Sequence, residues 1–194
     1  VQAMAGDVTI GGAITKDSGS DATTTLTATG NVLLSGDITS SANKLGLSIN
    51  GSTKVNGTRT LTSNNGSMSF GGTLDSYNVG LDPLTLNAGD GTVTFSGAVG
   101  SVKPLQSLSV TAATSAINGG SVITGVTGDG GSQSYSGNIT LGSAATTLTM
   151  VDTASNFTLA SGKSITNASG GDATLTIKTP SSIVLSSGSS ISSS

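Results

Sequence analysis

The side chains of this chain that could take part in acid–base chemistry are aspartates. All ten acidic residues are Asp, His and Cys are absent, and Arg59 is the single arginine. Glycoside hydrolysis needs a pair of carboxylates roughly 5–10 Å apart. Most of the aspartates instead stand beside Gly or Ser, where Asp favours turns; examples are Asp7, Asp37, Asp90, Asp129 and Asp172. We interpret them as corner residues, predict no catalytic residue and do not expect an enzyme.

Calcium binding is the second chemistry that this residue set suggests. Residues 128–131 read Gly-Asp-Gly-Gly and residues 170–172 read Gly-Gly-Asp, which are fragments of a calcium-binding nonapeptide repeat. Neither fragment recurs at nine-residue spacing, and calcium takes about six to eight oxygen ligands. We therefore expect turns at both places, with no metal site and no cofactor.

The composition limits the classes of protein and partner. Only 9% of the 194 residues are charged, which can indicate disorder, but 34% are hydrophobic and these recur at regular intervals. The net charge is −3 and the seven basic residues are scattered, so we expect no nucleic-acid partner. No run approaches the roughly 20 apolar residues of a spanning helix, so we expect no membrane insertion. The first residues have no apolar signal segment, so we expect any export signal to lie upstream or to have been removed.

A degenerate repeat runs along the chain. Its rule is Gly, any residue, apolar, any residue, apolar, any residue, Gly, any residue, apolar, and it occurs in residues 6–14, 30–38, 66–74 and 91–99. A second apolar pair follows each unit, as in Leu84-x-Leu86 and Leu108-x-Val110. The unit starts predict a period of roughly 22–25 residues, which is typical of solenoids. The longer gap from Gly30 to Gly66 predicts an irregular coil through Val55 and Leu61.

The repeat predicts an all-β fold without helices. Apolar residues at i and i+2 share one face of a strand, and the intervening Thr and Ser suit the outer face. Glycine supplies the positive φ angles of the corners. Recurrence at this period favours a right-handed parallel β-helix over an antiparallel sandwich. We predict one continuous domain over residues 1–194, with roughly eight coils and a length of about 40 Å. Eight residues should line a single interior stack: Val8, Ile10, Val32, Leu34, Met68, Phe70, Val93 and Phe95.

The position of a residue within the repeat also decides how the threonines and aromatic residues are interpreted. Threonine pairs in residues 25–29, 58–62, 92–94 and 147–149 fall at different phases, which argues against a flat ice-binding face. Phe70, Phe95 and Phe157 occupy inward positions, whereas Tyr77 and Tyr135 lie nearer predicted loops and are the expected exposed aromatics.

The serine-rich end of the chain carries the repeat as well. Ile183-x-Leu185 followed by Ile191 has the spacing of Phe157-x-Leu159 followed by Ile165, so residues 181–194 are predicted to form a coil rather than a linker.

Two segments show a resemblance to a known family. Residues 91–101 and 133–142 resemble the repeat regions of filamentous-haemagglutinin-like adhesins and other large bacterial surface exoproteins. The resemblance implies a right-handed parallel β-helix, export to the cell surface, a role as adhesin or stalk, and no catalytic residues. The Asn-Pro-Asn-Gly type of motif that is typical of the family's secretion domain is absent, so the segment is similar to part of the repetitive shaft.

Three functions follow as hypotheses. The first is a structural or adhesive extracellular rod, the shaft segment of a secreted or cell-surface bacterial protein, whose partners are neighbouring coils and a host or other cell surface or its glycans. The second is a filament subunit that stacks end to end through open β-helix ends, because residues 1–10 carry one charge and residues 181–194 carry none. The third, a carbohydrate-active β-helix enzyme, is disfavoured by the missing Glu and His.

Overall fold

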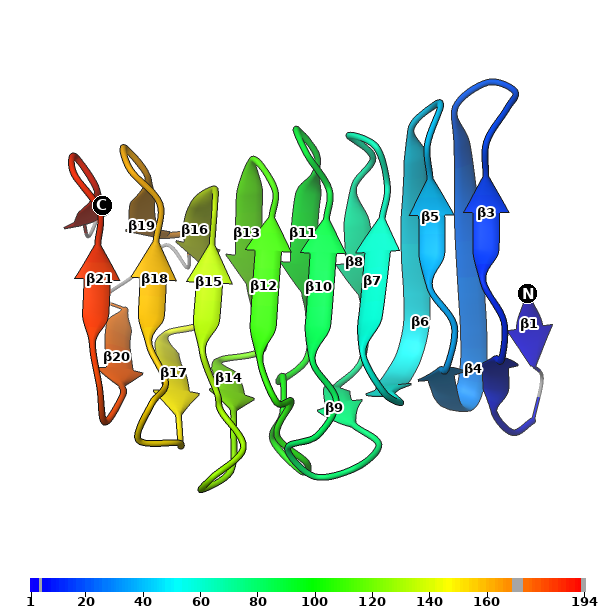
Figure 1. Cartoon of the computed structure of the whole chain (residues 1–194). Coiled ribbons are helices and arrows are strands. Elements are labelled where there is room, and N and C mark those ends of the chain that lie inside the picture. Colours follow the sequence, from blue (N-terminus) through cyan, green and yellow to red (C-terminus); the bar gives the residue numbers. More distant parts are fainter. Residues whose placement is uncertain (4, 169–172, 193–194) are drawn as a thin grey trace.

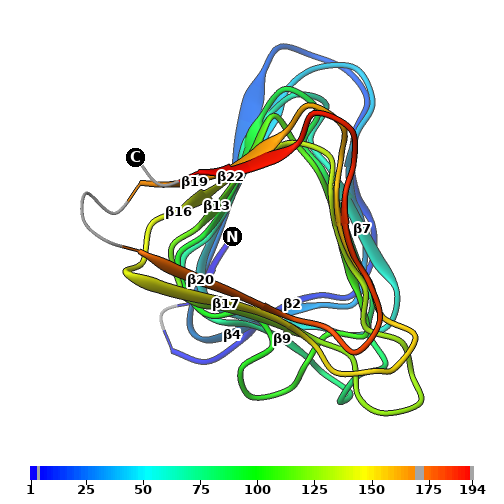
Figure 2. The same cartoon turned by 90° about the vertical axis from the view of Figure 1, so that its left-hand side faces the viewer.

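The protein is a parallel β-solenoid, which confirms the predicted fold class. The computed structural model describes residues 1–3, 5–168 and 173–192. Its coils stack side by side along one axis (Figure 1) and enclose a triangular cross-section when viewed along that axis (Figure 2). Neighbouring strands pair in parallel with strands about one coil away in sequence. A single interior therefore runs the length of the rod, and each coil buries its inner side against its neighbours.

The three sides of the triangle are called faces A, B and C, in the order in which the chain visits them. Face A contains β1 (Gln2–Ala3), the first parts of β4 (Ala22–Leu34) and β6 (Leu45–Val55), β8 (Met68–Phe70), β11 (Thr92–Phe95), β13 (Thr114–Ile117), β16 (Asn138–Leu141), β19 (Ser164–Asn167) and β22 (Ser190–Ser192). Face B contains β2 (Val8–Ile10), the second parts of β4 and β6, β9 (Leu74–Ser76), β14 (Ser121–Thr124), β17 (Ala145–Met150) and β20 (Thr174–Lys178). Face C contains β3 (Ile14–Lys16), β5 (Ile38–Ser40), β7 (Arg59–Thr62), β10 (Leu84–Asn87), β12 (Leu108–Thr111), β15 (Gln133–Tyr135), β18 (Phe157–Leu159) and β21 (Ile183–Leu185).

Inward side chains form columns because the registers hold from coil to coil. On face A, Phe70 lies beside Phe95, with ring centroids 5.7 Å apart and ring planes inclined by 11°. On face C, one column of aliphatic and aromatic side chains runs through eight successive strands, from Ile14, Ile38, Leu61 and Leu86 to Val110, Tyr135, Leu159 and Leu185. Columns of this kind explain why the same residue class recurs at the same position of the repeat.

The prediction of a single stack of eight residues is wrong in one respect. All eight are buried, but Val8, Ile10, Val32 and Leu34 pair on face B, whereas the other four pair on face A. The sequence rule describes a strand, a glycine corner and the next strand, and both the A–B and the B–C corners satisfy it. The first two repeat units therefore start one face later than the units at Gly66 and Gly91.

Because the first two repeat units start one face later, the long gap from Gly30 to Gly66 contains regular strands and not the predicted irregular coil. Val55 lies at the end of β6 on face B, and Leu61 pairs with both Ile38 and Leu86 in the face C column. Coil length does vary more than predicted: Leu47 pairs with Met68, but Ala145 pairs with Thr174 at the other end of the range.

Glycines serve the corners in two ways. Thirteen of the described glycines, Gly57 and Gly130 among them, have positive φ angles, as predicted. Those of the repeat rule other than Gly6 and Gly12 instead allow close approach of the backbone. Gly72, Gly97 and Gly119 stack on successive coils at the A–B corner. A Cβ atom on Gly97 would lie 2.5 Å from the carbonyl carbon of Gly72, and one on Gly119 would lie 2.1 Å from that of Gly97. Backbone meets backbone here, so no side chain fits without displacing the coils.

Tyr135 is buried, contrary to the prediction of an exposed aromatic. Its ring lies in the face C column, 5.9 Å from that of Phe157, and its hydroxyl donates to the buried Gln133 Oε1 at 3.2 Å. Gln133 Nε2 in turn donates to the carbonyls of Val122 and Thr149, at 3.1 Å each, and so joins faces B and C across the interior. Burial raises the pKa of the Tyr135 phenol. The sequence-based prediction that Tyr135 lies near a loop was wrong because β15 is short and its flanks are rich in Ser and Gly.

The inward hydroxyl of Thr53 interrupts an otherwise apolar stretch of its column and yields a stability prediction. Thr53 lies between Val32 and Leu74 on face B, its side chain is buried, and its hydroxyl has no hydrogen-bond partner among the described residues. Because valine has nearly the same shape and needs no partner, Thr53→Val should raise the free energy of unfolding by about 1 kcal/mol. Urea denaturation would measure the change.

Ser52→Ala, one residue earlier on the half-buried outer side of the same strand, is the matched control. A loss of stability in Thr53→Val with none in Ser52→Ala would show that the hydroxyl of Thr53 has a stabilising partner.

Candidate functional site

Six aspartates connect successive coils at the corners of the triangle. Their carboxylates accept hydrogen bonds from backbone N–H groups about one coil away in sequence, rather than only within their own turn. The pairs are Asp7 with Asn31 N at 2.6 Å, Asp21 with Lys44 N at 3.1 Å, Asp37 with Thr60 N at 3.0 Å, Asp75 with Val102 N at 3.0 Å, Asp82 with Gly57 N at 2.6 Å and Asp152 with Gly128 N at 2.9 Å. The predicted corner role of Asp7 and Asp37 thus takes the form of contacts between coils.

Asn and Ser side chains make equivalent contacts. Asn65 Oδ1 accepts from the backbone N–H of Asp90 at 2.9 Å, and Asn138 Oδ1 accepts from that of Ser164 at 3.0 Å. Ser67 Oγ accepts from the N–H of Thr92 at 3.1 Å. These bonds satisfy corner donors that the sheet ladders do not reach.

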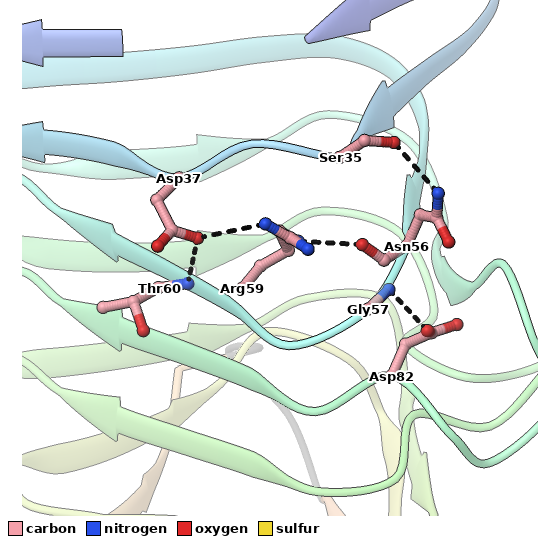
Figure 3. Close-up of polar contacts among 7 residues, drawn as sticks. All are labelled: Ser35, Asp37, Asn56, Gly57, Arg59, Thr60 and Asp82. Carbon is pink, nitrogen blue, oxygen red and sulfur yellow. Dashed lines mark hydrogen bonds and ion pairs between the residues drawn. The ribbon is translucent and has the colours of Figure 1, made fainter. Parts of the chain in front are cut away.

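One group of these contacts spans several coils at the B–C corner (Figure 3). Asp37 Oδ1 lies 3.6 Å from the Arg59 guanidinium, whose Nε donates to the Asn56 carbonyl at 2.8 Å. Asn56 also donates to Ser35 Oγ at 3.1 Å. The single arginine therefore has a structural position between coils.

Asp82 is the most enclosed carboxylate of this group. Its side chain is 1% exposed and accepts hydrogen bonds from Ser76 Oγ, from Asn78 N and, on the neighbouring coil, from Gly57 N. Burial alone would raise the pKa of Asp82, but the hydrogen bonds from Ser76, Asn78 and Gly57 outweigh it and hold this pKa below its usual value. The carboxylate stays ionised and orders the loop between β9 and β10.

The glycine loop that resembles a calcium fragment is ordered by an aspartate outside it. Asp129 is exposed, as a corner residue should be. Asp152, which sequence analysis did not single out, accepts from Gly128 N and Gly130 N, and from Ala154 N at 2.8 Å. The hydrogen bond from Ala154 is the main cause that lowers the pKa of Asp152. The only hint in the sequence is its place one coil after the loop.

Within the described residues, no group of three or more His, Cys, Asp or Glu side chains could hold a metal ion. Asp90 is exposed at a turn, and Asp172 with the fragment at 170–172 lies outside the described residues. Tyr77 is 46% exposed, as predicted.

More of the threonine pairs lie at equivalent positions of the coils than predicted. Thr25 and Thr94 belong to one outward column of face A, which continues through Thr140 and Thr166 with Ser and Ala between them. Thr60 lies on face C and Thr147 on face B, as their different phases indicated. Two hydroxyls of the face A column contact each other, with Ser69 Oγ 3.4 Å from Ser48 Oγ.

A hollow lies at the last coil. It has a volume of about 320 Å³ and is lined by Leu141, Ile165, Asn167, Ala173, Leu175, Ile191 and Ser192. These are mostly inward residues of faces A and B, so the hollow is the mouth of the solenoid interior. As predicted, the serine-rich end forms strands of a coil, in which Ile183 pairs with Phe157 and Ile191 with Ile165; residues 193–194 lie outside the described part.

Comparison with family models, with curated proteins and with solved structures gave no match. No helix long and apolar enough to span a membrane occurs in the described residues. The fold itself therefore defines the class, a three-sided parallel β-solenoid.

Proposed function

We propose that this solenoid is a structural rod, a shaft segment of an extracellular adhesin or related surface protein. The observation that carries the proposal is that many of its polar side chains contact neighbouring coils of the rod. The enclosed aspartates, the arginine and many corner amides bind neighbouring coils, and this favours a role in stiffness and length over chemistry on a ligand. The resemblance to surface exoproteins supplies the cellular setting, with a target on another cell surface or its glycans.

A rod built this way should tolerate the loss of one whole coil. Leu84 pairs with Leu108, so deletion of residues 84–107 leaves Leu108 in the place of Leu84 and restores every column. Deletion of residues 84–95 removes half a coil and brings Val99, which lies on face B, to the place of a face C strand. We expect the first variant to keep cooperative unfolding and the second to lose it, as measured by circular dichroism.

The cellular part of the proposal is tested by antibody labelling of intact cells that make the protein. We expect surface labelling without permeabilisation, and we expect the whole-coil deletion to shorten the distance between the cell envelope and the far end of the protein in electron micrographs. Labelling only after permeabilisation would contradict an extracellular shaft.

A filament subunit is the second candidate, and one observation favours it. The last coil exposes apolar residues that are inward in other coils, with Ile183 49%, Leu185 40% and Ile191 51% exposed. A further coil, of the same chain or of another copy, would cover these residues, and in the filament candidate it is a coil of another copy that pairs with β20, β21 and β22. In sedimentation experiments, a filament would give an open-ended series of masses that Leu185→Asp abolishes.

A further inference from the structure

Large apolar side chains are exposed at one corner in the middle of the rod. Apart from residues of the first and last coils, the exposed large apolar side chains in the described part all lie at the B–C corner. They are Tyr77 at 46%, Val79 at 49%, Leu81 at 54%, Val102 at 77% and Val151 at 39% exposed. Four of the five lie in two loops, residues 77–83 and 100–107, which follow one another on successive coils. Figure 1 shows the loops of this corner projecting below the strands near β9 and β14. Such a patch on an otherwise polar rod marks an interaction site.

The backbone of these loops is fixed in place. The carboxylate of Asp75 accepts from Val102 N at 3.0 Å and from Lys103 N at 3.2 Å, and Asp82 holds the loop 77–83 as described above. Gly80 N donates to the Pro104 carbonyl at 2.9 Å and so joins the two loops. The exposed side chains are therefore presented by an ordered support, and a partner would lose little free energy in ordering them.

The charges around the patch follow an order along the rod. Lys103 reaches back to the preceding coil, where its Nζ lies 5.9 Å from the Tyr77 ring centroid and donates to the Tyr77 carbonyl at 2.8 Å. Val102 lies in the middle loop. Asp129 is exposed in the loop of the following coil, which is joined to the middle loop by the bond from Gly125 N to the Leu105 carbonyl. Along the axis of the rod, the spatial order is thus a cation, an apolar centre and an anion.

We propose that this corner binds a second copy of the same chain, side by side and antiparallel, about a twofold axis through Val102. Rotation about that axis exchanges the preceding and following coils. It therefore places Lys103 of one copy against Asp129 of the other, twice. It also places Val102 against its counterpart and sets Leu81 of each copy over the loop that contains Asp129 in the other. An interface of this kind is self-complementary and closes at two copies. The other carboxylates of these loops, Asp75, Asp82 and Asp152, are buried and already bound to backbone donors, so they do not disturb this pairing.

Sedimentation equilibrium of the 194-residue chain over a concentration series tests the proposal. We expect a monomer–dimer equilibrium that Val102→Asp abolishes. Lys103→Asp alone and Asp129→Lys alone should each weaken the dimer about tenfold, because each exposed pair occurs twice. The double variant, Lys103→Asp with Asp129→Lys, should restore the wild-type dissociation constant.

Two controls separate this interface from other kinds of association. Thr94→Asp places a new charge on face A, away from the corner, and should leave the dimer unchanged. Leu185→Asp at the last coil should also leave it unchanged, whereas it would abolish end-to-end stacking. A monomer at all concentrations would overturn the proposal, as would failure of the double variant to restore binding or a mass that grows beyond two copies despite Leu185→Asp.

Discussion

Phe95→Ala should lower the free energy of unfolding by about 3–5 kcal/mol, because it removes a fully buried ring and leaves a cavity in the core. Phe95 is 0% exposed and stacks on Phe70, so the substitution also removes an aromatic contact between two coils. Each coil is stabilised by its neighbours, and the loss should therefore spread along the rod. The urea midpoint, followed by circular dichroism, measures the effect.

Asp129→Ala is the control for this experiment. Asp129 is exposed, and its removal should move the midpoint little in dilute protein, where the side-by-side dimer does not form. A midpoint that falls as far for Asp129→Ala as for Phe95→Ala would mean that Asp129 holds a metal ion or a hydrogen-bond network.

Asp82→Asn should lower the free energy of unfolding by about 2–3 kcal/mol at neutral pH, because the amide cannot accept the same set of hydrogen bonds and charge-assisted bonds are lost. The folded protein lowers the pKa of Asp82, so its contribution is complete above the pKa of the unfolded chain, near about 3.9. The difference from wild type should stay constant from pH 7 to about pH 4 and then shrink as the pH falls through the lower, folded pKa.

Asp129→Asn, at an exposed position, is the matched variant and should show no such loss at pH 7. If the difference between Asp82→Asn and wild type grew below pH 4, the carboxylate of Asp82 would be protonated in the folded protein and the hydrogen-bond assignment would be wrong.

The fold could be predicted from the sequence because the evidence for it is periodic. Apolar pairs such as Val93 and Phe95 set the inner side of a strand, and their recurrence after about one coil sets parallel stacking. The face on which each repeat unit begins could not be predicted, because the same glycine rule fits both the A–B and the B–C corner. Residues 6–14 and 66–74 look alike but occupy different faces.

The roles of single polar residues were harder to predict, because they depend on residues a full coil away. Nothing local distinguishes Asp152, which orders a loop, from Asp129, which is exposed in that loop. Tyr135 was assigned to a loop because its neighbours are polar, and only the register with Val110 and Leu159 shows it to be inward. The corner patch could not be predicted for a similar reason, since Leu81 and Val102 fit no repeat position.

The stacking of coils in parallel register is the central claim, and amide nuclear Overhauser contacts test it most directly. Thr94 on face A pairs with Ser69 on one side and Ala116 on the other. The structure predicts backbone contacts from Thr94 to the strands of both residues, with the same direction of chain in all three. Contacts from Thr94 to a strand that runs in the opposite direction, or to neither of these strands, would contradict the solenoid.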